Sequence, residues 1–145
     1  MRFRERVSVP WWWWGLGVLL LASLVIAVLA YVDAWAGVAF SVAAAFAIAV
    51  LLAGYTLRVQ VDDDALVVGR YRLEGRYIAA AEPFEGESAR RILGPEADHS
   101  ALLQTRPYTD ALVRIVLDDP ADPHASWLIS TRRPQELAEA VRSIL

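Results

Sequence analysis

The stretch WWWWGLGVLLLASLVIAVLAYV, residues 11–32, decides the fold of this chain because it is long and carries no charge. A helix of about 20 apolar residues can cross the hydrocarbon core of a bilayer. A second uncharged stretch, AGVAFSVAAAFAIAVLLAGYTL, covers residues 36–57, and the connection DAWA between the two leaves room only for a tight turn. We therefore expect a transmembrane hairpin over residues 11–57. A cleaved signal peptide is the alternative, but the apolar run is too long and a second span follows at once.

Aromatic residues flank both apolar stretches, as they do at membrane–water interfaces. The expected interface anchors are Trp11, Trp12, Trp13, Trp14, Tyr31, Trp35 and Tyr55. An aromatic cage around a cationic ligand is the alternative. Four consecutive helical residues point about 100° apart, however, and cannot all face one ligand. The anchor interpretation is therefore favoured.

Arginines set the expected orientation of the hairpin. The positions are Arg2, Arg4 and Arg6 before the first apolar stretch and Arg58 after the second. Only Asp33 is charged in the connection. By the positive-inside rule, a multi-pass protein of the cell membrane with both termini in the cytoplasm is expected. Residues 1–10 are then a cytoplasmic arm whose arginines can also contact anionic lipid.

The second apolar stretch is rich in alanine. Ala39, Ala43 and Ala47 recur at intervals of four residues, as do the alanines at 45, 49 and 53. Small residues at this spacing let helices approach closely in lipid. The partner is either the first helix or another chain, which leaves open a homo-oligomer through helix 36–57 or a larger membrane complex.

The remaining residues, 58–145, read as a cytoplasmic β domain. They contain 11 arginines and 15 acids, a net charge of 11 − 15 = −4, which argues against a nucleic-acid partner. Alternation with period two predicts strands. The expected strand segments are 56–61, 65–78 (one bent strand or two short ones), 100–105, 111–117 and 126–131, the last two pairing across loop 118–125.

Two helices are expected in this domain. A short one lies around 89–93, and an amphipathic one covers about 134–145, with Pro134 at its first position and Glu136 in its first turn. A succession of strands followed by one amphipathic helix resembles a pleckstrin-homology-like (PH-like) antiparallel barrel or sheet. The fold class is therefore membrane-anchored α+β, a two-helix hairpin followed by this domain. The analogy concerns the fold and not the function.

Several motifs together resemble a family of small actinobacterial membrane proteins known as domain of unknown function 3093. The motifs are ERVSVPWWWW at 5–14, GPEAD at 94–98, RPY at 106–108, DDPADP at 118–123 and WLISTRRPQELAEA at 127–140. The resemblance spans nearly the whole chain. It implies a membrane-anchored protein, and it carries no activity, cofactor or catalytic residue with it.

The chain shows little that predicts chemistry. It has no cysteine, P-loop, nucleophile elbow or dinucleotide-binding turn, so we expect no catalytic residue and no cofactor. The acids and His124 in loop 118–125 could ligate a metal, but a plain hairpin connection is favoured and no metal site is expected. Arg106, Arg132 and Arg133 are candidate contacts for an anion, the latter two beside the start of the last helix.

These features predict a non-enzymatic, membrane-tethered interaction or scaffold module with the bilayer and an unidentified protein as partners. One alternative is recognition of anionic lipid or a phosphate ligand by the PH-like domain. Another is an accessory subunit of a larger membrane complex.

Overall fold

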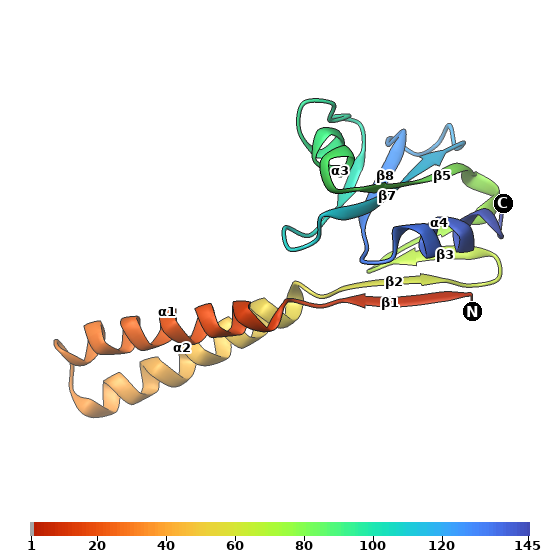
Figure 1. The fold of residues 1–145 in the computed structure, drawn as a ribbon. Helices are drawn as coiled ribbons and strands as arrows, with labels where there is room; N and C mark the ends of the chain where they lie inside the picture. The colour runs from red at the N-terminus through yellow and green to blue at the C-terminus, as the bar shows by residue number, and fades with distance from the viewer. Residues whose placement is uncertain (1) are drawn as a thin grey trace. The chain divides into compact units, whose positions relative to one another are not determined.

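The computed structural model describes residues 2–145, which form two compact units (Figure 1). One unit, the αβ domain, combines the N-terminal residues up to Val7 with Leu57–Leu145. The other, Ser8–Thr56, is the helical hairpin. The hairpin is thus an insertion in the chain of the αβ domain.

The αβ domain contains two four-stranded sheets. The first has the order β1-β2-β3-β4 and is antiparallel throughout, with β1 Phe3–Val7, β2 Leu57–Val61, β3 Ala65–Val68 and β4 Tyr71–Glu74. The second has the order β5-β7-β8-β6, with β5 Ile78–Glu85, β6 Leu102–Gln104, β7 Ala111–Leu117 and β8 Ser126–Ser130. A 3-10 turn, η1 Gly75–Tyr77, links the sheets in the chain.

Most of the expected strands are present, and β7 has the expected bounds. β8 pairs antiparallel with β7, as predicted. The short β6 pairs parallel with β8, which the sequence did not indicate. The mainly antiparallel sheets and the C-terminal helix agree with the predicted fold class, but neither sheet closes into a barrel.

Strand β1 was not expected. Its sequence FRERV alternates, so that Phe3, Glu5 and Val7 are buried while the two arginines between them are exposed. It pairs antiparallel with β2, from Phe3 opposite Val61 to Val7 opposite Leu57. The segment before the hairpin therefore forms an edge strand of the domain and not a separate arm over residues 1–10.

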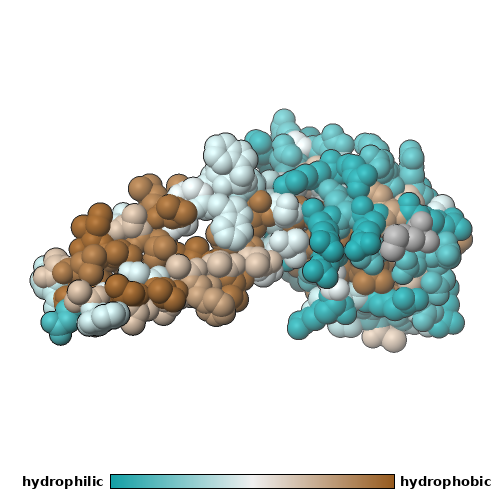
Figure 2. Space-filling model, turned by 90° about the horizontal axis from the view of Figure 1, so that it is seen from below, coloured by the Kyte–Doolittle hydropathy of each residue, from teal (hydrophilic) through white to brown (hydrophobic). Residues whose placement is uncertain are grey.

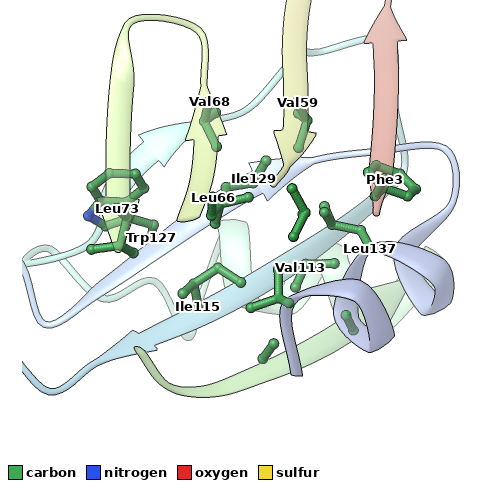
Figure 3. Packing of buried hydrophobic residues seen from close by; sticks show 14 of the residues in the cluster. Phe3, Val59, Leu66, Val68, Leu73, Val113, Ile115, Trp127, Ile129 and Leu137 are labelled. Carbon is green, nitrogen blue, oxygen red and sulfur yellow. The ribbon is translucent and has the colours of Figure 1, made fainter. Parts of the chain in front are cut away.

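The main hydrophobic core lies between the two sheets, where buried side chains from both meet (Figure 3). The C-terminal helix α4, Pro134–Arg142, contributes Leu137, Ala138 and Val141 to it. α4 ends three residues before the predicted end at 145. A Cβ on Gly75 would collide with the carbonyl oxygen of Ile144, so only glycine fits there.

Helix α3, Gly86–Leu93, covers a smaller core cluster. Its buried Ala89 and Ile92 pack with Leu112 of β7 and Leu128 of β8. A reciprocal capping box between Glu85 and Ser88 begins the helix, earlier than the predicted 89–93. α3 thereby packs against the second sheet.

The hairpin consists of α1 Trp11–Leu29 and α2 Ala34–Gly54, both long and apolar enough to cross a membrane. None of the residues of α1 is buried, and only Gly37 and Leu52 of α2 are. A core helix of a soluble protein would instead be mostly buried. The apolar surface of these helices contrasts with the hydrophilic surface of the αβ domain in Figure 2.

Both helices end before the predicted limits of 32 and 57. α1 gives way to a turn after Leu29, and Asp33 precedes the first residue of α2. α2 ends at Gly54 because Leu57 already pairs with Val7 in the sheet.

Candidate functional site

The hairpin is inserted between two neighbouring antiparallel strands. Val7 and Leu57, the residues at which the chain leaves and re-enters the αβ domain, face each other as the last pair of the β1–β2 ladder. Only three residues separate Val7 from α1, and two separate α2 from Leu57. Both ends of the hairpin therefore attach to one place on the domain.

A buried carboxylate fastens β1 to the C-terminal part of the domain. Glu5 accepts hydrogen bonds from the Thr131 hydroxyl and, at 3.0 Å, from the Arg132 N–H. The Thr131 oxygen accepts a further bond from the Arg133 N–H at 3.1 Å. We call Glu5 and Thr131 the β1 latch, because they connect the edge strand to the junction between β8 and α4.

The guanidinium of Arg133 is occupied by contacts within the domain. It donates to the Arg4 carbonyl at 3.0 Å and to Glu136 at 3.1 Å, and it lies 4.8 Å from the centre of the Phe3 ring. These contacts also hold β1 against α4. Arg133, one of the predicted anion contacts, therefore packs between β1 and α4 in this structure.

The other two predicted anion contacts lie near one tyrosine. Burial raises the pKa of Tyr108, while the neighbouring Arg106 and Arg132 act in the opposite direction. The Tyr108 hydroxyl donates to the Val7 carbonyl at 3.0 Å, next to the point where the hairpin begins. The structure therefore brings Arg106 and Arg132 together around Tyr108.

Arg106 also lines a pocket of about 670 Å³ between α3 and loop 105–110. Its backbone N–H donates to the Ser130 hydroxyl at 2.9 Å, and its side chain donates to the Thr105 carbonyl at 3.0 Å. Arg90 of α3 and the acid Asp110 are the other charged residues of the lining. Two guanidiniums against one carboxylate make this pocket suitable for an anion.

The acidic loop forms part of a second pocket, of about 430 Å³. Asp119 and Asp122 line it, and each carboxylate accepts a hydrogen bond from the N–H two residues later, at 2.9 and 2.8 Å. The His124 Nδ1 lies 3.1 Å from the Ser100 carbonyl oxygen. Within residues 2–145, the structure groups no three side chains of the kinds that bind metals. Through their hydrogen bonds to the backbone, the two aspartates shape the loop.

Ser100 also organises the turn that precedes β6. The Ser100 hydroxyl and N–H both donate to Asp98, at 2.6 and 2.8 Å, and these two bonds lower the pKa of that carboxyl. The side chain of Asp98 is thus engaged by a local turn.

The predicted interface aromatics lie at the two ends of the hairpin. In the first turn of α1, Trp11 is 84% exposed while the Trp13 ring lies 6.4 Å from that of Tyr55, the residue that follows α2. At the other end, Tyr31 and Trp35 are almost fully exposed. The Trp12 and Trp13 rings lie 5.7 Å apart, whereas Trp11 is the most exposed of the four tryptophans.

The two alanine series lie on different parts of α2. Ala45 and Ala49 are half-buried and border an apolar pocket together with Gly17 of α1. Ala43 and Ala47 are exposed, although Ala47 borders a second apolar pocket that α1 also lines. The first helix is thus one partner of the small residues. Association of two chains through α2 stays a prediction.

The arginines from which the orientation of the hairpin was predicted lie on or next to β1 and β2 of the first sheet. Arg4 and Arg6 are exposed on β1, and Arg58 is exposed on β2 directly opposite Arg6. Arg2 donates to the Ser143 carbonyl at 2.6 Å and lies 3.7 Å from Asp63. The β1–β2 pairing therefore gathers residues separated by the whole hairpin.

The sequence analysis did not identify Glu5, Tyr108 or Arg90 as residues of a candidate site. The alternation in FRERV was a usable signal for β1, and thus for a buried Glu5. Nothing in the sequence indicated that Arg90 and Arg106 line one pocket, since no pattern relates α3 to loop 105–110.

Comparison with known proteins identifies one family. The chain matches the model of a family described as protein of unknown function (DUF3093) over residues 2–141. Searches of curated proteins and of solved structures gave no match. Because the match covers β1, the hairpin and nearly all of the αβ domain, the chain belongs to the DUF3093 family.

Proposed function

We propose that this protein is a non-enzymatic, membrane-tethered binding module. Its hairpin spans the cell membrane, and its αβ domain acts at the cytoplasmic surface. The observation that carries the proposal is the pairing of Val7 with Leu57 across the hairpin. A two-helix span returns the chain to the side from which it left, as this pairing requires.

The same pairing argues against a cleaved signal segment. Cleavage after α1 would separate β1 from the rest of the domain, and with it the buried Phe3, Glu5 and Val7. The exposed apolar surfaces of α1 and α2 also favour lipid as their surroundings. The positive-inside rule then favours the cytoplasm for the domain, because Arg6 and Arg58 flank the hairpin.

Tethering explains how such a small domain can act through weak contacts. A membrane anchor raises the local concentration of the domain near other membrane proteins, so modest affinity suffices. The partner is expected to be a protein at the same membrane surface.

The test is crosslinking of full-length tagged protein in its native membrane, followed by identification of captured proteins. In one control, residues 8–56 are replaced by a two-residue turn, which keeps β1 paired with β2. In a second, an unrelated two-helix membrane hairpin takes their place. We expect capture of a partner by the full-length protein, loss in the first control and recovery in the second. Capture that persists without any hairpin, or no capture at all, would contradict a tethered module.

A second candidate function is recognition of a phosphate-bearing ligand, favoured by the pocket in which Arg90 and Arg106 meet. Arg90→Gln should weaken binding of a soluble phosphate compound to the full-length protein. Arg91→Gln is the matched control, because Arg91 is also exposed on α3 but does not line the pocket. Equal effects of both substitutions would exclude this pocket as the site.

A further inference from the structure

Three arginines gather on the exposed face of β1 and β2, at the base of the hairpin. Arg6 and Arg58 lie directly opposite each other, one pair away from Val7 and Leu57. Arg4 is two residues further along β1, opposite Gln60. We call Arg4, Arg6 and Arg58 the basal arginine cluster.

Like charges placed opposite each other on a sheet destabilise it. Within residues 2–145, no acid forms an ion pair with any of the three cluster guanidiniums. The acid between them in sequence, Glu5, is buried on the other face of β1. Nothing in the described chain therefore offsets the repulsion between Arg6 and Arg58.

A shortage of acids does not explain this arrangement. The αβ domain contains all 14 arginines but 16 of the 17 acids, a net charge of 14 − 16 = −2. Some arginines elsewhere in the domain have acidic neighbours: Arg72 lies 3.3 Å from Asp64, and Arg76 lies 2.8 Å from Glu74. Within residues 2–145, Arg70, Arg90 and Arg91 form no ion pair with an acid either, so the cluster is distinguished by the direct opposition of Arg6 and Arg58 across β1 and β2.

The chain itself keeps this cluster close to the hairpin ends. Arg6 precedes Trp11 by five residues, and Arg58 follows Tyr55 by three. Fully extended chain covers at most about 3.6 Å per residue, so these arginines lie within about 18 Å and 11 Å of the interface aromatics. In a membrane-spanning protein, that distance reaches the lipid headgroups.

We infer that the basal arginine cluster binds the phosphate group of an anionic lipid headgroup. This inference rests on the proposed membrane-spanning hairpin. A guanidinium presents a planar fork of N–H donors that matches phosphate oxygens. One phosphate between Arg6 and Arg58 replaces their mutual repulsion with two attractive contacts, and Arg4 adds a third donor group at the same face.

The test compares Arg58→Gln with Arg72→Gln in the full-length protein. Both residues are exposed on the first sheet, but Arg72 is on β4 and pairs with Asp64. The protein is held in zwitterionic micelles with added phosphatidylcholine or phosphatidic acid. Bound lipid is counted by native mass spectrometry, and the thermal unfolding midpoint of the αβ domain is recorded.

We expect phosphatidic acid to bind the wild-type protein and raise its midpoint, because a ligand of the folded state stabilises it. Arg58→Gln should weaken this binding by at least about tenfold, the effect of losing one charged hydrogen bond. Arg72→Gln should leave binding within about twofold. With phosphatidylcholine alone, Arg58→Gln should keep or raise the midpoint, since it removes the repulsion from Arg6.

Other outcomes would overturn the inference. A lower midpoint of Arg58→Gln in phosphatidylcholine would make Arg58 a structural residue. If both variants bind phosphatidic acid equally less than the wild-type protein, the lipid is attracted by the overall charge of the domain and not by a specific site. Inorganic phosphate that displaces the lipid at equal concentration would identify a soluble phosphate ligand. If the hairpin inserts and a partner is captured while no variant changes lipid binding, only this inference fails. If the hairpin does not insert, the proposed function fails as well.

Discussion

Removal of the Glu5 carboxylate is the sharpest test of how the αβ domain holds its first strand. Glu5 is 8% exposed and accepts hydrogen bonds from the Thr131 hydroxyl and the Arg132 N–H. A hydrogen bond to a charged group contributes about 1.5–3 kcal/mol. Because the Arg132 N–H is only part-buried, the lower end applies, and Glu5→Ala should cost about 3 kcal/mol for both bonds together.

The assay is amide hydrogen exchange in the full-length protein in detergent micelles. Loss of the β1 latch should let β1 detach locally from β2 before the domain unfolds. Since about 1.4 kcal/mol corresponds to a factor of ten, protection of amides in β1 and β2 should fall about 100-fold. Amides of β7 should be protected as before, because β7 lies in the other sheet.

Two variants serve as controls for this prediction. Glu5→Gln retains an oxygen acceptor without the charge, so its loss of protection should be smaller than that of Glu5→Ala. Arg6→Ala changes the exposed neighbour on the same strand and should alter protection by about twofold at most. Protection in Glu5→Ala within about threefold of wild type would refute the β1 latch as an energetic contact.

Three further predictions follow from the same contacts. Replacing residues 8–56 with an Asn-Gly turn should give a soluble, folded domain by circular dichroism, whereas the fragment 58–145 should aggregate because it lacks β1. Gly75→Ala should destabilise the domain by about 1–3 kcal/mol in thermal unfolding, because its Cβ would collide with the Ile144 carbonyl. The raised pKa of Tyr108 should appear in a spectroscopic titration as a phenol that ionises above the ordinary value of about 10.

The sign of the tyrosine prediction follows from its linkage to folding. A folded-state pKa above the unfolded value means that the stabilising contribution is complete at neutral pH. It is then lost as the pH rises through the folded-state pKa, because the phenolate cannot donate to the Val7 carbonyl. Tyr108→Phe should remove this pH dependence.

Each of these predictions has an outcome that contradicts it. A folded fragment 58–145 would show that β1 is dispensable. Arg76→Ala is the control for Gly75→Ala, because the Arg76–Glu74 pair is exposed and contributes about 1 kcal/mol at most. Equal stabilities of those two variants would refute the close approach at Gly75. If the Tyr108→Phe variant gives the same tyrosine titration as the wild-type protein, the phenol with the raised pKa belongs to another tyrosine.

Four elements could be predicted from short stretches of the sequence alone. The uncharged runs gave two helices, and the alternation in ALVRIVL gave β7 over Ala111–Leu117. The amphipathic spacing after Pro134 gave α4. In β7 and α4, burial on one face sets the period of the sequence directly, whereas the hairpin helices were evident from the length of their uncharged runs.

The features that depend on distant residues escaped prediction. β1 is only five residues long, and its partner β2 lies beyond the hairpin. β5, with the sequence IAAAEPFE, includes alanines and a proline that weaken any strand signal, and pairing with β7 stabilises it. The parallel pairing of β6 with β8 needs a crossover that no local pattern encodes.

The candidate sites show the same division. The arginines flanking the hairpin were evident from the sequence, but the opposition of Arg6 and Arg58 appears only in the register of β1 and β2. Arg133, predicted to contact an anion, also contacts the Arg4 carbonyl and Glu136, and its contact with an anion stays a prediction. Charge alone did not distinguish an arginine that packs from one that is open to a ligand.

The central claim, a hairpin that spans the membrane with the αβ domain in the cytoplasm, is tested most directly by cysteine labelling. The chain has no cysteine, so Asp33→Cys and Ser100→Cys each introduce a single thiol. With a membrane-impermeant maleimide on intact cells, Asp33→Cys should react at once. Ser100→Cys should react only after the membrane is permeabilised. Labelling of both thiols, or of Ser100→Cys alone, in intact cells would contradict this topology.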